Sequence, residues 1–379
     1  MKEGFLKLSA ALTAIILFIG TPSVFSAERQ KITALYIPLA DHYAAIVAYE
    51  KYRNEMQYAD FEIIQMKSWP DLRGKFEAGQ CDMAFIICPM AMDMFKANPD
   101  FRWVSLMHRD GNAMAISDNL NDLVQLKEDR LERKPDSKVA DVCDRWKKKT
   151  GKSSICAVPS LYATHTAVLY QYLKNHGKIL DFGEPNNGII VAKAVAPPLS
   201  PQFLKNEDDR GNIASFEQSL PWADVVETGG FGKVAWYSKD VVIWPLGHVE
   251  CIVIATDDAI RNKKEAIKEV IEYIHKAGRD IDLAREKGGE ELRNIALMIN
   301  TYHIQGHNTD AIIKSLDWNL SVINYSNLNV DKPGLKQIMD ICVEANMIDP
   351  INIDTFADES FGTEITKTDE SEPAEMTKN

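Results

Sequence analysis

SWPDLRGKFEAGQCDMAFIICPMAM, residues 68–92, is the stretch that decides the fold. Ser68 and Trp69 follow an apolar run at 61–66, and Pro70 marks the expected start of a helix. The apolar run CDMAFII at 81–87 then predicts a buried strand, which Pro89 and Met90 close. A strand–helix–strand order of this kind favours an α/β architecture with largely parallel sheets.

The same alternation extends in both directions from this stretch. A helix is predicted over 164–175, ending at Gly177, and an amphipathic helix over about 261–277. The chain is expected to be mostly helical from about 257 to 348. Strands are predicted at KITALYI (31–37), FEIIQM (61–66), CDMAFII (81–87), WVSLM (103–107), NAMAIS (112–117), SICAV (154–158), IIVAKAV (189–195), ADVVE (223–227) and ECIVIA (250–255).

The order of these elements predicts two lobes joined by a hinge. We expect the chain to cross between lobes near 117–120 and again near 240–248, with a ligand cleft between them. The expected divisions are a signal peptide (1–26), the first part of lobe 1 (27–117), lobe 2 (118–243) with a charged insertion (118–152), a mostly helical return to lobe 1 (244–352), and a disordered acidic tail (353–379).

The N-terminus has the order of a secretory signal. Lys2 and Lys7 precede an apolar run of about 13 residues, too short to span a bilayer, and Ser26 and Ala27 are small residues at the expected cleavage site. This pattern predicts a cleaved signal peptide and a periplasmic protein. The alternative is an uncleaved membrane anchor.

Composition excludes several classes of function. A net charge of −12 argues against nucleic acid as a partner, because binding to phosphates requires a basic face. The sequence contains no phosphate loop, nucleophile elbow, or zinc-protease motif, and no catalytic residue, cofactor or metal ion is predicted. His303 and His307 are expected in a surface loop. Of the six cysteines, which are expected to be buried thiols, Cys143 and Cys156 form the one pair that merits testing as a disulfide.

Candidate ligand-binding residues follow the carboxyl ends of predicted strands. In a strand–turn–helix unit these positions, with the N-terminal amides of the helix, face the crevice between lobes. The set comprises Asp41, His42, Tyr43, Ser68, Trp69, Pro89, Met90, Asn112, Tyr162, Thr164 and His165. Asp41 has an alternative role as the N-cap of a helix at 42–52, which we favour, and Asn112 as a turn residue after Gly111.

Several segments resemble the nitrate- and bicarbonate-binding proteins of ATP-driven (ABC) importers, a group that includes sulfonate and taurine receptors. They are ITALYIPLADHYAAIVAYEKY (32–52), residues 68–92, DGNAMAIS (110–117), VPSLYATHTAVLYQYL (158–173), APPLSPQFLK (196–205) and SLPWADVVETGGFGKVAWYSKDVVIWP (219–245). The resemblance implies a two-lobed periplasmic-binding-protein fold of type II that closes on its ligand and docks on an inner-membrane permease. It also implies ligand contacts for Trp69 and His165. Trp69 could instead pack at the edge of the lobe, and Arg73 is expected on the lobe surface.

The sequence departs from the family pattern at positions where relatives would contact a charged ligand. Leu220 stands where many relatives have an acidic residue before Pro-Trp, and no basic residue follows Trp222 closely, Lys233 being the nearest. We expect a monomer that binds a small polar or anionic, nitrate- or sulfonate-like solute. The alternatives are a periplasmic sensory module and an enzyme similar to the synthases of the thiamine pyrimidine precursor.

Overall fold

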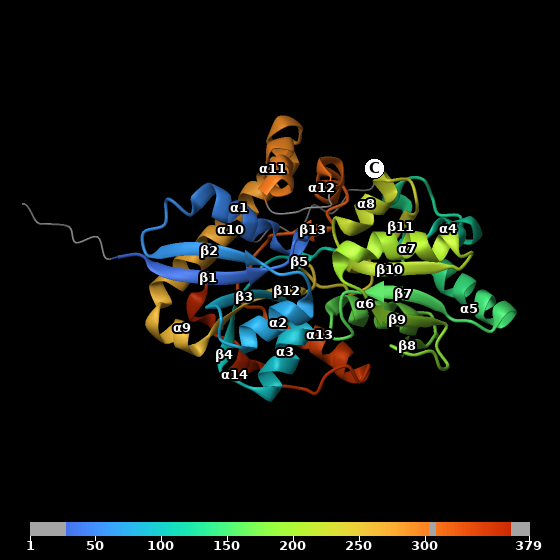
Figure 1. Ribbon diagram of the computed structural model, residues 1–379, viewed down its shortest axis with the longest axis horizontal. Coiled ribbons are helices and arrows are strands. Elements are labelled where there is room, and N and C mark those ends of the chain that lie inside the picture. Colours follow the sequence, from blue (N-terminus) through green and yellow to red (C-terminus); the bar gives the residue numbers. More distant parts are fainter. Residues whose placement is uncertain (1–27, 303–307, 365–379) are drawn as a thin grey trace, which may run out of the picture.

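Two mixed β-sheets, one in each lobe, organise the chain (Figure 1). The computed structural model describes residues 28–302 and 308–364. The predicted signal peptide, both histidines of the predicted 303–307 loop, and the tail beyond 364 lie outside the described residues. Among the residues described, no helix combines the length and apolarity needed to cross a bilayer.

The first lobe is built on a five-stranded sheet. β1 pairs in parallel with β2 and β3, while β12 is antiparallel to both β3 and β4. The strands β3 and β12 are buried almost throughout, which explains why they read as continuous apolar runs. In spatial order the strands are β2 (Ala59–Gln65), β1 (Gln30–Tyr36), β3 (Met83–Ile87), β12 (Cys251–Thr256) and β4 (Phe101–Leu106).

The second lobe is built on a six-stranded sheet. Its β7 pairs in parallel with β9 and β10, and β6 is antiparallel to its two neighbours β10 and β11. In spatial order the strands are β11 (Lys233–Tyr237), β6 (Asn112–Ile116), β10 (Ala214–Ser219), β7 (Ser154–Val158), β9 (Ile190–Ala194) and β8 (Leu180–Phe182).

The chain crosses between the lobes twice. We expected the first lobe to continue through residue 117, but β6 already belongs to the second sheet, so the first crossing lies at Gly111, just after the short strand β5 (Arg109–Asp110). The return crossing lies between β11 and β12. Gly247 in this return has a φ of 92°, and a Cβ there would lie 2.3 Å from Oδ2 of Asp110. The two crossing segments are therefore in direct contact, and only glycine fits at this position.

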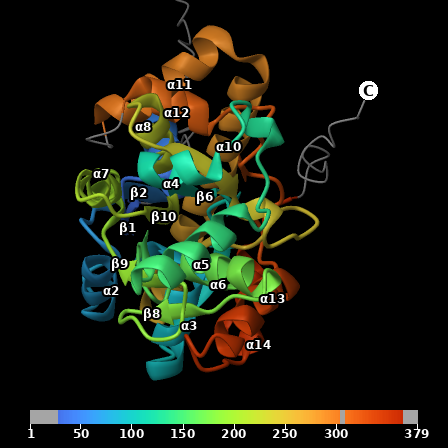
Figure 2. The same cartoon turned by 90° about the vertical axis from the view of Figure 1, so that its right-hand side faces the viewer.

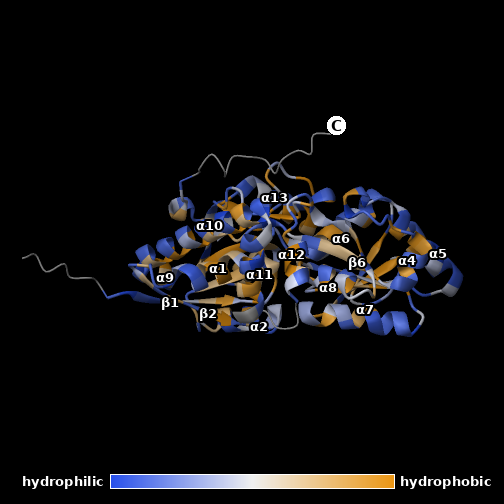
Figure 3. Cartoon of the chain, turned by 90° about the horizontal axis from the view of Figure 1, so that it is seen from above, coloured by the Kyte–Doolittle hydropathy of each residue, from blue (hydrophilic) through white to orange (hydrophobic). Residues whose placement is uncertain are grey.

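Helices pack on both sheets, and hydrophilic and hydrophobic residues alternate along their ribbons in Figure 3, as expected of amphipathic helices. The first lobe carries α1 (Tyr43–Tyr52), α2 (Trp69–Glu77), α3 (Cys88–Ala97), α9 (Asp257–Asn262) and α10 (Lys264–Lys287). The second carries α4 (Asp118–Val124), α5 (Lys138–Thr150), α6 (Thr164–Asn175), α7 (Ser200–Asp209) and α8 (Trp222–Thr228). The prediction of a strand at 223–227 is therefore wrong.

The C-terminal part of the chain packs on both lobes. It comprises α11 (Gly289–Tyr302), α12 (Thr309–Ser315), β13 (Ile323–Asn324), α13 (Lys332–Glu344) and α14 (Ile353–Phe356). The second-lobe helices α8 and α6 contact α12 and α13 respectively, and Figure 2 shows α12 and α13 on opposite sides of the molecule. These contacts join the lobes at two places besides the crossings.

Two further sequence predictions are settled by burial and bonding. The disordered tail was predicted to begin at 353, but α14 lies there and the side chains of Phe356 and Phe361 are fully buried. Phe356 packs against Phe95, Phe101 and Trp103, which explains why this segment is ordered. All six cysteines are free thiols, so Cys143 and Cys156 do not form a disulfide.

Candidate functional site

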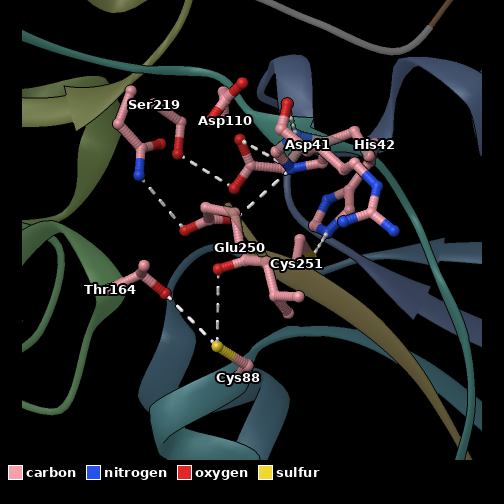
Figure 4. Close-up of polar contacts among 12 residues, drawn as sticks. Asp41, His42, Cys88, Asp110, Thr164, Ser219, Glu250 and Cys251 are labelled. Carbon is pink, nitrogen blue, oxygen red and sulfur yellow. Dashed lines mark hydrogen bonds and ion pairs between the residues drawn. The ribbon is translucent and has the colours of Figure 1, made fainter. Parts of the chain in front are cut away.

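A group of fully buried polar side chains lies where the two lobes meet (Figure 4). We call it the inter-lobe cluster. From the first lobe it includes residues of the turn after β1. The crossing segments contribute residues next to β5 and just before β12. The second lobe contributes residues of β6, β10 and the start of α6. The members are Asp41, His42, His108, Asn112, His165, Glu217, Ser219, His248 and Glu250, each 0% exposed.

A hydrogen-bonded chain through Ser219 connects the two lobes inside this cluster. The hydroxyl of Ser219 donates to Oδ2 of Asp41 at 2.9 Å, and Nε2 of His165 lies 2.8 Å from the same hydroxyl oxygen. Because Ser219 gives its hydrogen to Asp41, we assign the hydrogen of His165 to Nε2. The bare Nδ1 of His165 then faces Oε1 of Glu250 at 3.5 Å.

Glu250 lies at the centre of the cluster. Besides His165, its carboxyl group approaches Nδ2 of Asn112 at 3.5 Å and Nε2 of His108 at 3.3 Å. Burial raises the pKa of Glu250 to about 8. Burial, reinforced by the charge of Glu250, also raises the pKa of Asp41 well above its ordinary value.

The imidazoles of the cluster are neutral at physiological pH. Burial lowers the pKa of His42 to about 3, that of His165 well below its ordinary value, and those of His108 and His248 in the same direction. The cluster therefore offers lone pairs and carboxyl oxygens rather than fixed positive charge.

Apolar and sulfur-containing side chains border the cluster in the first lobe. The ring of Trp69 is fully buried and meets that of His42 edge-on, with centroids 5.9 Å apart. Pro89 and Met90 are buried in the first turn of α3, next to Cys88. The sulfur of Cys88 lies 3.7 Å from the hydroxyl of Thr164, which gives a further contact between α3 and the second-lobe helix α6.

The model of the NMT1-like family matches residues 26–296 of the sequence. The chain belongs to this family. No curated protein matches the sequence at a significant level.

Solved structures similar to this NMT1-like chain include proteins that bind small solutes. The periplasmic nitrate-binding protein NrtA of Synechocystis PCC 6803 has a TM-score of 0.68 at 17% identity, over 86% of this chain and 84% of that one. A zinc-bound ligand-binding component of an ABC-type import system from Staphylococcus aureus has a TM-score of 0.67 at 18% identity, over 88% and 98%. The alkanesulfonate-binding protein SsuA of Xanthomonas axonopodis pv. citri, bound to MOPS, has a TM-score of 0.59 at 10% identity, over 86% and 96%. The expected α/β, two-lobed periplasmic-binding-protein fold is confirmed.

The NMT1-like structure brings several predicted site residues together and places others elsewhere. Asp41, His42, Asn112 and His165 belong to the inter-lobe cluster, while Trp69, Pro89, Met90 and Thr164 border it. Asp41 is not an N-cap, because no side chain caps α1 and its carboxyl group turns to Ser219 instead.

The remaining predicted positions have local roles or face away from the cluster. Tyr43 is buried in the first turn of α1, and Ser68 caps α2 by accepting a hydrogen bond from the amide of Asp71. Tyr162 is 43% exposed. Arg73 pairs with Glu77 and Asp93, which confirms its predicted place on the lobe surface, and Lys233 pairs with Glu128.

Sequence reasoning missed five members of the cluster in this NMT1-like chain. They are His108, Glu217, Ser219, His248 and Glu250. A signal was present in part: Glu250 opens the otherwise apolar run ECIVIA, and Glu217 interrupts a strand-length segment, ASFEQS. Burying a carboxyl group within a strand costs free energy of folding, and proteins tend to keep such groups where they have a function. Interruptions of this kind therefore mark candidate sites.

Glu217 gives a prediction about pH. Neither of its carboxyl oxygens has a hydrogen-bond partner, and burial, followed by the charges of Glu250 and Asp41, raises its pKa well above the ordinary value. The stability that the protonated acid contributes is complete below about pH 4.3, the unfolded value, and is lost as the pH rises through the folded pKa. Glu217→Gln should therefore raise the melting temperature at pH 8 relative to the unmodified chain, and leave it unchanged at pH 4. An equal gain at both pH values would contradict this account.

Proposed function

We propose that this protein is an extracytoplasmic solute-binding protein that encloses a small polar solute in the inter-lobe cluster and delivers it to the permease of an ABC importer. The importer-binding proteins compared above support this role, since they share the fold across nearly their whole length. An export signal and a periplasmic location belong to the same proposal.

One observation carries the proposal: unpartnered polar atoms from both lobes are buried at the lobe junction. They are Oδ1 of Asp41, Nε2 of His108, Oδ1 of Asn112, Nδ1 of His165 and Oε2 of Glu250. Buried polar groups in proteins nearly always have a hydrogen-bond partner. A solute held between the lobes would supply the partners that these atoms lack.

The atoms themselves indicate which solute would fit. Carboxyl oxygens, an amide oxygen and bare imidazole nitrogens all accept hydrogen bonds or coordinate cations. No described lysine or arginine pairs with Asp41, Glu217 or Glu250. Within the expected class of small polar or anionic solutes, we therefore favour one that donates hydrogen bonds or carries positive charge over a nitrate-like anion.

Closure of the lobes explains how affinity would arise. Ser219 bonds to Asp41, and Cys88 approaches Thr164, only while the lobes are together. A solute bound to both lobes would shift an open–closed equilibrium toward this closed form by its differential contacts. A sensory module would close in the same way, and crosslinking to an importer permease distinguishes the two roles.

A thermal-shift screen of the purified chain tests the proposal. The solutes should include polyamines, aminopyrimidines and other donor-bearing molecules, with nitrate, bicarbonate, taurine and alkyl sulfonates as the anionic arm. A solute present at 100 times its Kd adds about 2.7 kcal/mol of stability, which gives a clear shift. We expect hits among the donor-bearing or positively charged solutes, to which divalent cations are added, and none among the anions.

The residue-level prediction concerns His165. His165→Ala should weaken binding of a screen hit by about 10- to 100-fold, the effect of losing one buried hydrogen bond and its closure contact. His176→Ala is the matched control, because His176 lies at the opposite end of the same helix and bonds to Pro135. Hits confined to the anions and unaffected by His165→Ala would overturn the assignment of the solute and of its site.

A further inference from the structure

Four side chains of the inter-lobe region converge on one point. Asp41, His108, Glu250 and Cys251 each direct one potential ligand atom into the same volume, and these atoms all lie within 4.8 Å of one another. Each of the four residues is fully buried. They come from the turn after β1, the residue before β5, the residue before β12, and the first residue of β12. Figure 4 labels three of them, Asp41, Glu250 and Cys251.

Three of the four atoms have no hydrogen-bond partner. Nε2 of His108 lies 3.6 Å from Oδ1 of Asp41 and 3.3 Å from Oε2 of Glu250, and all three are unpartnered. Nδ1 of His108 lies 3.4 Å from the carbonyl oxygen of Arg109, so we assign the hydrogen of His108 to Nδ1, which leaves a lone pair on Nε2. Two carboxyl oxygens and an imidazole nitrogen that face one another this closely must share either protons or a cation, and a metal ion bound between them would replace the protons.

The two distances from Nε2 of His108 fit a tetrahedral metal site. Nitrogen and oxygen ligands lie about 2.0–2.2 Å from Zn²⁺, so tetrahedral geometry places neighbouring ligands about 3.3–3.6 Å apart. The two distances measured at His108 fall within this range. Cys251 supplies the fourth position. Its thiol now lies 3.4 Å from Nε2 of His42, and a metal ion would replace the thiol hydrogen.

The outer contacts of the candidate ligands are those that metal sites use. Metal-binding histidines usually donate their second ring N–H to a carbonyl or carboxylate, and metal-binding carboxylates accept a further hydrogen bond. His108 faces the carbonyl of Arg109, and the second oxygen of Asp41 accepts from Ser219. The sequence prediction of no metal site rested on spacing along the chain, which could not relate residues 41, 108 and 250.

We propose that Asp41, His108, Glu250 and Cys251 bind a divalent transition-metal ion, with Zn²⁺ the best match to one sulfur, one nitrogen and two oxygen ligands. The inference rests on the proposed function and deepens it, since it names a divalent cation as the solute that the inter-lobe cluster captures.

Zn²⁺ and Co²⁺ titrations of the purified, untagged and chelator-treated chain test this site. Calorimetry should show one Zn²⁺ bound per chain, and Co²⁺ should give a near-ultraviolet thiolate-to-metal absorption band. His108→Gln should weaken Zn²⁺ binding by about 100-fold or more, because loss of even an outer-shell partner costs about 10- to 100-fold. Cys251→Ser should abolish the cobalt–thiolate band. Cys143→Ser, which removes a buried thiol from α5 in the second lobe, should retain both properties.

Folding of each variant is checked separately by circular dichroism and by its metal-free melting temperature. Absence of Zn²⁺ binding to the unmodified chain, or equal binding by folded His108→Gln and Cys251→Ser variants, would overturn the metal site. Organic hits from the thermal-shift screen of metal-free protein would still leave the solute-binding role standing. Conversely, Zn²⁺ binding with the predicted variant effects, but without crosslinking to a permease, would support the site and count against the importer role.

Discussion

Arg109→Met is expected to lower the free energy of unfolding by about 3–5 kcal/mol, the usual effect of breaking a buried ion pair from one side. Arg109 is 1% exposed, and its guanidinium bonds to Oδ2 of Asp331 at 2.8 Å and to the carbonyl oxygens of Gly247 and Asn327. It thereby ties the first crossing segment to the return crossing and to the start of α13. Methionine fills the same space but supplies none of these hydrogen bonds.

Urea unfolding followed by circular dichroism measures this loss. Arg261→Met is the control, because Arg261 forms an exposed ion pair with Asp258 at 3.4 Å and should cost about 0–1 kcal/mol. If Arg109→Met changes stability no more than the control does, the crossing segments are held by their apolar packing and not by this side chain.

Glu269→Ala should be comparably destabilising, by about 3–5 kcal/mol. The carboxylate of Glu269, on α10, accepts hydrogen bonds from the backbone amides of Gln57, Tyr58 and Ala59 at 2.6, 2.7 and 2.9 Å. A hydrogen bond to a charged group contributes about 1.5–3 kcal/mol; the bond from Ala59 is buried and the other two are partly buried, so entering water recovers part of the loss. This single side chain therefore fixes the start of β2 to the helix that covers it.

Glu272→Ala is the matched control, since Glu272 is exposed on the same helix. Chemical denaturation should show the loss only in the Glu269 variant, and hydrogen exchange at the amides of residues 57–59 should accelerate there. Unchanged exchange at these amides would show that water or neighbouring groups replace the carboxylate fully.

Elements with a clear period could be read from the sequence. The helix predicted over 164–175 is α6, because its apolar positions repeat at helical spacing and Gly177 follows its end. The buried strands β3 and β12 could likewise be predicted from their apolar runs. Regular patterns of this kind are set by local burial, which one sequence can reveal.

Short segments without such a period misled the prediction. ADVVE at 223–227 was predicted as a strand because two valines favour strands, but it belongs to α8, which packs against α7, α12 and β11. The strand β10 was missed because Glu217, Gln218 and Ser219 are polar although fully buried. Glu217 and Ser219 belong to the inter-lobe cluster, so this strand lacks the continuous apolar run that normally marks a buried strand.

For a related reason, only part of the candidate site could be predicted from the sequence. The rule that side chains after strands face the crevice found Asp41, His42 and His165. Their partners Glu250 and His108 lie before strands, where this rule gives no guidance. Which carboxyl group meets which imidazole depends on tertiary contacts between residues more than 60 positions apart, and no local pattern encodes those contacts.

The complete burial of the inter-lobe cluster has a kinetic consequence. With every member at 0% exposure, no solute can reach or leave the cluster while the lobes are together. Capture must then wait for the lobes to part, so its rate at high solute concentration is limited by the opening step and not by diffusion. Release is limited in the same way, which would make the residence time of the solute a property of the hinge as much as of the contacts that hold it.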